Sequence, residues 1–128
     1  MKQICFGDQE FVAAGHENPV NPGVWKKVLF RRDDLQAGRI QMVNWARLPA
    51  GNTFAPHYHE DMQEIFIVLS GVTRIRVGDE EVSLGCGDAV LIDPREVHQM
   101  WNDGREDVDY LAIGIAGAED GKTVLIDS

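Results

Sequence analysis

Short runs of β-forming residues, separated by turn residues, constrain the fold of this chain more than any other feature. Residues 39–48 alternate in character with a period of two, which predicts a half-buried strand. We expect its buried face to carry Ile40, Met42, Asn44, Ala46 and Leu48. Further strands are expected around His57 and His59 and at residues 24–30, 64–70, 72–77, 81–84, 89–92, 97–102 and 108–116, with 124–126 as a candidate edge strand. No long window has a helical period, so the sequence predicts an all-β barrel or sandwich.

The first 23 residues differ from the rest because turn-forming residues interrupt them. These residues are Gly15, Asn18, Pro19, Asn21, Pro22 and Gly23. We therefore expect residues 1–23 to form an N-terminal arm and residues 24–128 to form a single barrel domain. A chain of 128 residues is long enough for one such domain with one hydrophobic core.

Composition and charge argue against several classes of function. The chain has 12 Lys and Arg against 21 Asp and Glu, a formal net charge of -9, which disfavours binding to a nucleic-acid backbone. No stretch approaches the ~20 apolar residues of a membrane-spanning helix, and the first residues lack the apolar run of a signal peptide. Cys5 and Cys86 have no framework spacing, so we expect both to be reduced and the protein to be cytoplasmic.

Three of the four histidines fall in two segments that predict a metal site. His57 and His59 occupy alternate positions, so in a strand both side chains point to one face, and Glu64 follows after a short bend. His98 offers a third imidazole in a later extended run. Neutral imidazole and carboxylate suit divalent first-row metals, so we expect His57, His59, Glu64 and His98 to bind one ion. The fourth histidine, His16, is expected to be a solvated loop residue.

The same residues resemble the cupin family. Its first motif matches at Gly51, His57, His59, Glu64 and Gly71, and its second at Gly87, His98 and Asn102. The resemblance covers about residues 40 to 116 and implies a double-stranded β-helix, a jelly-roll barrel of two packed sheets with the metal in its mouth. The second motif departs at its corner, where Asp93 takes the usual Pro position and Arg95 the usual Gly position. We expect Asn102 to fix the following turn through its side chain.

The resemblance implies two functions of different classes. The first is a metal-dependent enzyme that acts on a small polar molecule, by dioxygenase, decarboxylase, isomerase or lyase chemistry, with an iron-dependent oxidoreductase slightly favoured. The second is a binding module that holds a metal or small molecule without turnover. Imidazole-rich sites accept Fe, Mn, Ni, Zn, Co or Cu, so the sequence leaves the metal open.

Tyr110 is the candidate catalytic residue. In the run 108–116, Tyr110 shares a face with the small residues Ala112 and Gly114, and small residues leave room for a cavity. We expect this face to line the pocket, while packing of Tyr110 on the outer surface stays open as the alternative. The same parity argument gives Met42, Asn44, Phe54, Phe66 and Met100 as candidate pocket walls.

A homodimer is expected from the strand at residues 24–30. It is apolar on both faces around Lys26 and Lys27 and has no obvious partner in a minimal barrel. An exposed edge of this kind favours pairing with another chain. We expect a two-fold dimer that buries this strand or the outer face with Trp45.

Overall fold

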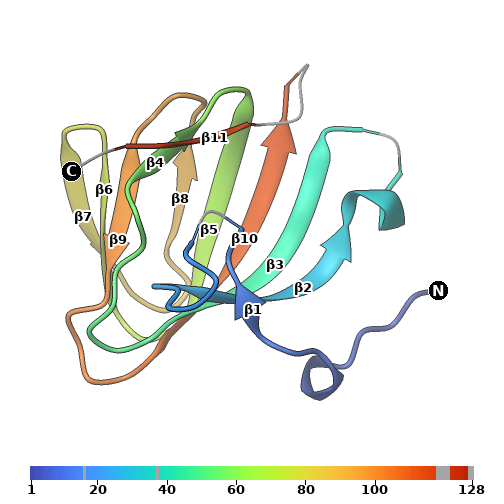
Figure 1. Ribbon diagram of the computed structural model, residues 1–128, viewed down its shortest axis with the longest axis horizontal. Coiled ribbons are helices and arrows are strands. Elements are labelled where there is room, and N and C mark those ends of the chain that lie inside the picture. The colour runs from blue at the N-terminus through green and yellow to red at the C-terminus, as the bar shows by residue number, and fades with distance from the viewer. Residues whose placement is uncertain (16, 37, 118–121, 127–128) are drawn as a thin grey trace.

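Two antiparallel sheets face each other in the computed structural model, which describes residues 1–128 except 16, 37, 118–121 and 127–128 (Figure 1). The six-stranded sheet has the order β1 (Val12–Ala13), β2 (Trp25–Arg31), β3 (Ile40–Leu48), β10 (Val108–Ala116), β5 (Met62–Ser70) and β8 (Ala89–Ile92). The five-stranded sheet has the order β11 (Thr123–Leu125), β4 (His57–His59), β9 (His98–Trp101), β6 (Thr73–Val77) and β7 (Glu80–Leu84). Two short 3-10 turns, η1 (Phe6–Asp8) and η2 (Arg32–Asp34), complete the described elements. The predicted all-β fold is confirmed.

The long central strands β3, β10 and β5 bury alternate residues, as the period of two predicts. The buried members of this face include Asn44, Ala46, Leu48, Glu64, Phe66, Val68, Tyr110 and Ala112. Ile40 is an exception, because it is 44% exposed instead of buried. It pairs with Ile115, where a register shift after Gly114 interrupts the ladder. Met42, also expected inside, is half-buried, so the alternation is weak over the first residues of β3.

The turns of the two motifs contain left-handed backbone conformations, at one position without a glycine. The motif glycines Gly51 and Gly71 have φ values of 80° and 85°, in the region that favours glycine. Arg95, in the usual glycine position of the corner, has a φ of 68°. This conformation costs a side-chain-bearing residue about 1 to 2 kcal/mol. The Arg95 N–H donates to the His59 carbonyl at 2.7 Å, which helps to offset that cost and ties the corner to β4.

The N-terminal segment packs on the outer face of the six-stranded sheet. Phe6 contacts the Trp45 ring at 4.8 Å between centroids, and the Lys27 ammonium lies 3.6 Å from the centre of the Phe6 ring. β1 pairs with the first residues of β2, and β2 pairs with β3 along its length. The expectation that the strand at residues 24–30 lacks a partner is therefore wrong, since it has one within the chain. The dimer itself stays a prediction.

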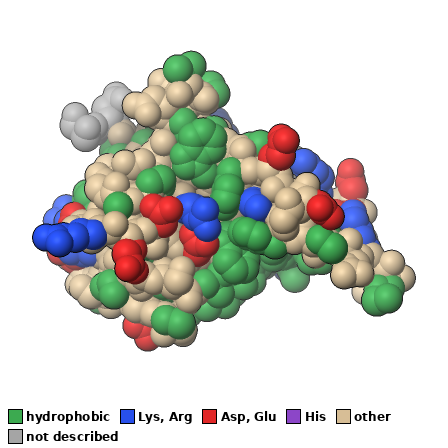
Figure 2. Space-filling model, turned by 90° about the horizontal axis from the view of Figure 1, so that it is seen from below, with side chains coloured by type: hydrophobic (Ala, Val, Ile, Leu, Met, Phe, Trp, Pro, Cys, Tyr) green, Lys and Arg blue, Asp and Glu red, His purple; other side chains and the backbone are tan. Residues whose placement is uncertain are grey.

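The surface carries both signs of charge. Figure 2 shows acidic and basic side chains interspersed with apolar ones over the face seen from below. Cys5 and Cys86 are free and exposed. Within the described part of the chain, no helix has the length and apolar character needed to cross a bilayer.

Candidate metal centre

The predicted ligands come together between the two sheets. His57 and His59 lie on β4, His98 lies on the adjacent β9, and Glu64 reaches them from β5 in the opposite sheet. His57 pairs directly with His98 across the two strands, with 4.3 Å between ring centroids. All four side chains are buried. Alternation along β4 turns both of its imidazoles inward, as the i, i+2 spacing predicts.

The spacing of the ligand atoms suits a single ion. One nitrogen or oxygen atom from each side chain lies within 4.8 Å of the other three. Glu64 Oε1 lies 2.7 Å from His59 Nε2 and 3.2 Å from His98 Nε2. Ligand atoms about 2.1 Å from a common ion are about 3.0 Å apart at right angles and about 4.2 Å apart when opposite. The two printed contacts lie on either side of the value for neighbouring ligands of one ion.

Hydrogen bonds on the far side of each ring fix the imidazoles. His57 Nδ1 donates to the Ala55 carbonyl at 2.7 Å, and His98 Nδ1 donates to the Glu96 carbonyl at 3.0 Å. Each contact places the proton on Nδ1 and leaves the Nε2 lone pair for a metal. His59 Nδ1 lies 3.0 Å from Thr123 Oγ1 on β11, which pairs with β4 at this position.

The charge state of the cluster also suits a cation. Burial works against an ionised Glu64, but contacts with His59 and His98 outweigh it and hold the pKa of Glu64 well below its usual range. His98 Nε2 is buried and makes no hydrogen bond within the described residues, although Glu64 lies close by. A buried imidazole nitrogen 3.2 Å from a carboxylate oxygen, without a hydrogen bond between them, fits a cation that both atoms would bind. The four residues could therefore hold a divalent first-row ion, with coordination positions left open.

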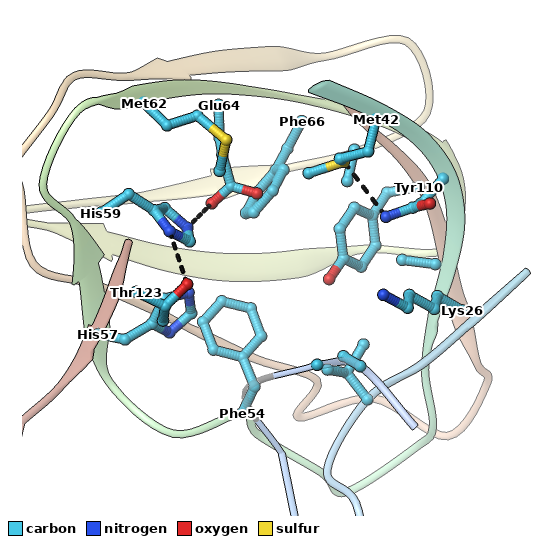
Figure 3. A pocket seen from close by; sticks show the side chains of 16 residues that line it. Lys26, Met42, Phe54, His57, His59, Met62, Glu64, Phe66, Tyr110 and Thr123 are labelled. Atoms are coloured by element: carbon cyan, nitrogen blue, oxygen red, sulfur yellow. Dashed lines mark hydrogen bonds and ion pairs between the residues drawn. The ribbon is translucent and has the colours of Figure 1, made fainter. Parts of the chain in front are cut away.

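A cavity of about 190 Å³ opens beside the cluster (Figure 3). It is small next to the ~300 to 1,000 Å³ pockets that bind drug-sized ligands. Of the expected walls, Met42, Asn44, Phe54 and Phe66 line it. Met100 does not, because it is fully buried opposite Ile75 in the core between β9 and β6. The expectation that Met100 lines the pocket is therefore wrong. Its side chain points inward, as its position in the strand predicts, but it packs in the core and does not reach the cavity.

Tyr110 lines this cavity, so the alternative of outer-surface packing is excluded. Its ring lies 5.0 Å from that of Phe66, and the residue is buried. Burial, followed by the negative charges of Glu64 and Glu17, raises the pKa of Tyr110. Its hydroxyl makes no hydrogen bond to the described residues. A buried hydroxyl normally has a partner, so this one is free to meet a ligand. Its catalytic role stays a prediction.

Two further residues at the site were missed by sequence reasoning. Thr123, in the tail expected to form only an edge strand, contacts His59. Lys26 lines the cavity from β2, where it pairs with Ala46. Ala46 is expected on the buried face from the sequence, and residues that pair across two strands share a face. Pairing residues 24–30 with residues 39–48 in the observed register would therefore have placed Lys26 inside.

The remaining polar residue of the second motif acts in the fold. Asn102 donates to the carbonyls of Leu48 and Glu106, at 2.9 and 2.8 Å, and accepts from the Gly104 N–H at 3.0 Å. The prediction that it fixes the following turn is confirmed. His16 lies outside the described residues.

Known proteins share parts of this sequence. The family described as a cupin domain matches residues 44–114, more than half of the 128-residue chain. The Oxalate-binding protein of Thermotoga maritima is 31% identical over 67 residues, which make up 52% of this chain and 55% of that protein. The chain thus spans about half the length of this curated relative.

Solved structures share the fold at lower identity. A Thermotoga maritima protein described as a predicted oxalate decarboxylase has a TM-score of 0.80 and 21% identity, with 91% of this chain and 100% of the other covered. The polyketide cyclase RemF of Streptomyces resistomycificus has a TM-score of 0.80 and 19% identity, with 100% of this chain and 87% of the other covered. Such identities show the fold alone. The match across residues 44–114 places the chain in the cupin family.

Proposed function

We propose that this protein is a metal-dependent enzyme that acts on a small polar molecule. The observation that carries the proposal is the buried cluster of His57, His59, Glu64 and His98, of which the first three line a small cavity. A divalent ion held there would supply Lewis acidity and open positions for oxygen atoms of a substrate. Structural metal sites, by contrast, are closed by protein ligands.

The side chains around the cluster have separable tasks. Phe54, Phe66 and Met62 form apolar walls that exclude bulk water from the ligand nitrogens. The raised pKa of Tyr110 keeps its hydroxyl protonated, so it acts as a hydrogen-bond donor and not as a base. The cavity size favours a substrate of few non-hydrogen atoms.

Within this class we favour oxygen-dependent chemistry with iron in the cytoplasm. Imidazole and carboxylate ligands with open positions are typical of non-haem iron oxygenases. The test is elemental analysis of protein purified without a His-tag, followed by oxygen-uptake and turnover assays with small organic acids, oxalate among them. We expect about one metal ion per chain and turnover that disappears on chelation. A chain that takes up no divalent metal would overturn the proposal.

A binding module without turnover is the second candidate. Apart from His57, His59 and Glu64, the described lining residues include just two titratable groups, Lys26 and Tyr110. A relative is named Oxalate-binding protein, which also fits a binder. Calorimetry and product analysis on the same metal-loaded sample separate the two: tight binding with no product favours the module.

A further inference from the structure

Lys26 projects a positive charge into the cavity from its rim. Its partner across the strands is Ala46, which lines the cavity, whereas the next residue, Lys27, pairs with Trp45 and faces outward under Phe6. Figure 3 shows the Lys26 ammonium and the Tyr110 hydroxyl directed into the same space. The alternation of β2 thus sends one of two adjacent lysines inward.

In the described part of the chain, no carboxylate neutralises Lys26. Among the described residues it makes no ion pair and no side-chain hydrogen bond. Burial and the nearby Arg31 guanidinium both lower the pKa of Lys26. Elsewhere the chain pairs its arginines closely, as in the contact of Arg47 with Asp109 at 2.7 Å. Acidic residues outnumber basic ones by 21 to 12, so an unpaired, half-buried ammonium is not explained by a shortage of partners.

A second polar group on the same wall also lacks a partner. Asn44 Oδ1 is buried and makes no hydrogen bond within the described residues, and its Nδ2 reaches only the weak acceptor Met42 Sδ at 3.2 Å. The amide can turn to present either atom to a ligand. Together with Tyr110, this end of the cavity offers an ammonium, a hydroxyl and an amide. Donors of this kind match a carboxylate.

We propose that the cavity binds a small dicarboxylate, with one carboxylate at the His57–His59–Glu64–His98 centre and the other on Lys26. This assignment rests on the proposed metal-dependent function and adds to it the class of substrate. β2 and β5 are three strand spacings apart in the sheet order, about 14 Å if the sheet were flat. Side chains that reach inward shorten this gap, so diacids of three to five carbons are the probes to test.

The experiment uses full-length protein loaded with Co²⁺, with metal content measured for every sample. Calorimetry gives the Kd of malonate, succinate and glutarate and of the matched monoacids propionate, butyrate and valerate. Lys26→Met removes the charge and keeps the stem, while Lys26→Arg restores a cation. Arg105→Gln is the control, because it removes one exposed positive charge that does not line the cavity.

We expect at least one diacid to bind the parent about 10-fold or more tightly than its monoacid, since a charged hydrogen bond contributes this much. Lys26→Met should abolish that preference at unchanged metal content, with recovery in Lys26→Arg and no change in Arg105→Gln. Equal binding of diacids and monoacids by the parent, or an undiminished preference in Lys26→Met, overturns the dicarboxylate assignment. Failure to load Co²⁺ instead overturns the proposed metal-dependent function beneath it.

Discussion

The two ends of the cavity differ in how completely their polar groups are satisfied. At the histidine end, the Nδ1 atoms of His57, His59 and His98 all have partners, supplied by Ala55, Thr123 and Glu96. At the other end, the Lys26 ammonium, the Tyr110 hydroxyl and Asn44 Oδ1 have none within the described residues. The first end is organised before anything binds, and the second is completed only by a ligand.

The histidine end owes its order to a repeated local contact. His57 and His98 each donate to the carbonyl two residues earlier, and they face each other across paired strands. Two neighbouring strands thus orient their imidazoles in the same way without side chains from elsewhere. Outer contacts of this kind raise the basicity of the ligand nitrogen and fix its direction.

Removal of a ligand should have the largest effect. His59→Ala takes one of four donors from the histidine end, and we expect metal affinity to fall by more than ~100-fold, beyond the loss typical of outer contacts. The fold should survive because the core is apolar and the other strands are unchanged. Metal content after dialysis measures the effect. Tyr58→Ala is the control, since Tyr58 lies beside His59 on the other face of β4 and does not line the cavity. Equal metal retention by both variants would show that His59 is no ligand.

The unsatisfied end should affect turnover without affecting the metal. Tyr110→Phe removes only the hydroxyl, which makes no hydrogen bond to the described residues. We expect turnover on a confirmed substrate to fall by about 100-fold, the scale of one hydrogen-bond donor lost at a reacting centre, while metal content and thermal stability stay at the parental level. Kinetics and elemental analysis on one sample provide the measurement. A variant with parental kinetics would remove Tyr110 from the reaction and leave it as a cavity wall.

The partner of His59 should have an intermediate effect on the histidine end. Thr123→Val keeps the side-chain shape and removes the hydroxyl 3.0 Å from His59 Nδ1. We expect metal affinity to fall by about 10-fold, at the low end for outer contacts. Competition with a metal-binding dye gives the affinity. Thr73→Val is the control, because the Thr73 hydroxyl donates to the Trp101 carbonyl and does not line the cavity. This variant should leave the metal affinity unchanged.

The sequence predicted the ligands well because strand alternation is local. The parity of residues 57–59, 64–70 and 108–116 was enough to place the three β4 and β5 ligand candidates and Tyr110 on inward faces. Lys26 could not be placed, because its direction depends on the pairing of β2 with β3, a contact between segments that the sequence pattern did not connect. Thr123 depends on a tail that returns to β4. Met100 shows the converse limit, since inward parity does not distinguish core from cavity.

The smallest effect on the cavity is expected from the outer face of the same strand. Asp109 precedes Tyr110 on β10 but accepts hydrogen bonds from Arg47 Nε at 2.7 Å, Arg47 Nη2 at 2.8 Å and Trp45 Nε1 at 2.9 Å. Burial opposes its ionisation, but these donors prevail and lower the pKa of Asp109. Asp109→Asn should therefore lower the free energy of unfolding by about 2 kcal/mol at pH 7 and leave metal affinity and turnover unchanged.

The pH dependence of this loss gives the sharper test. A carboxyl with a depressed folded-state pKa contributes its stability above the unfolded-state value, near 3.9, and loses it as the pH falls through the folded-state value. Denaturant unfolding at several pH values should thus show the parent and Asp109→Asn converging below about pH 4. Asp103→Asn, which removes the exposed partner of Arg74, should match the parent throughout, because exposed ion pairs add little. If the difference in free energy of unfolding between the two proteins persists unchanged into acid, ionisation of Asp109 does not stabilise β10. The polar contacts of the outer face would then contribute less than those of the histidine end.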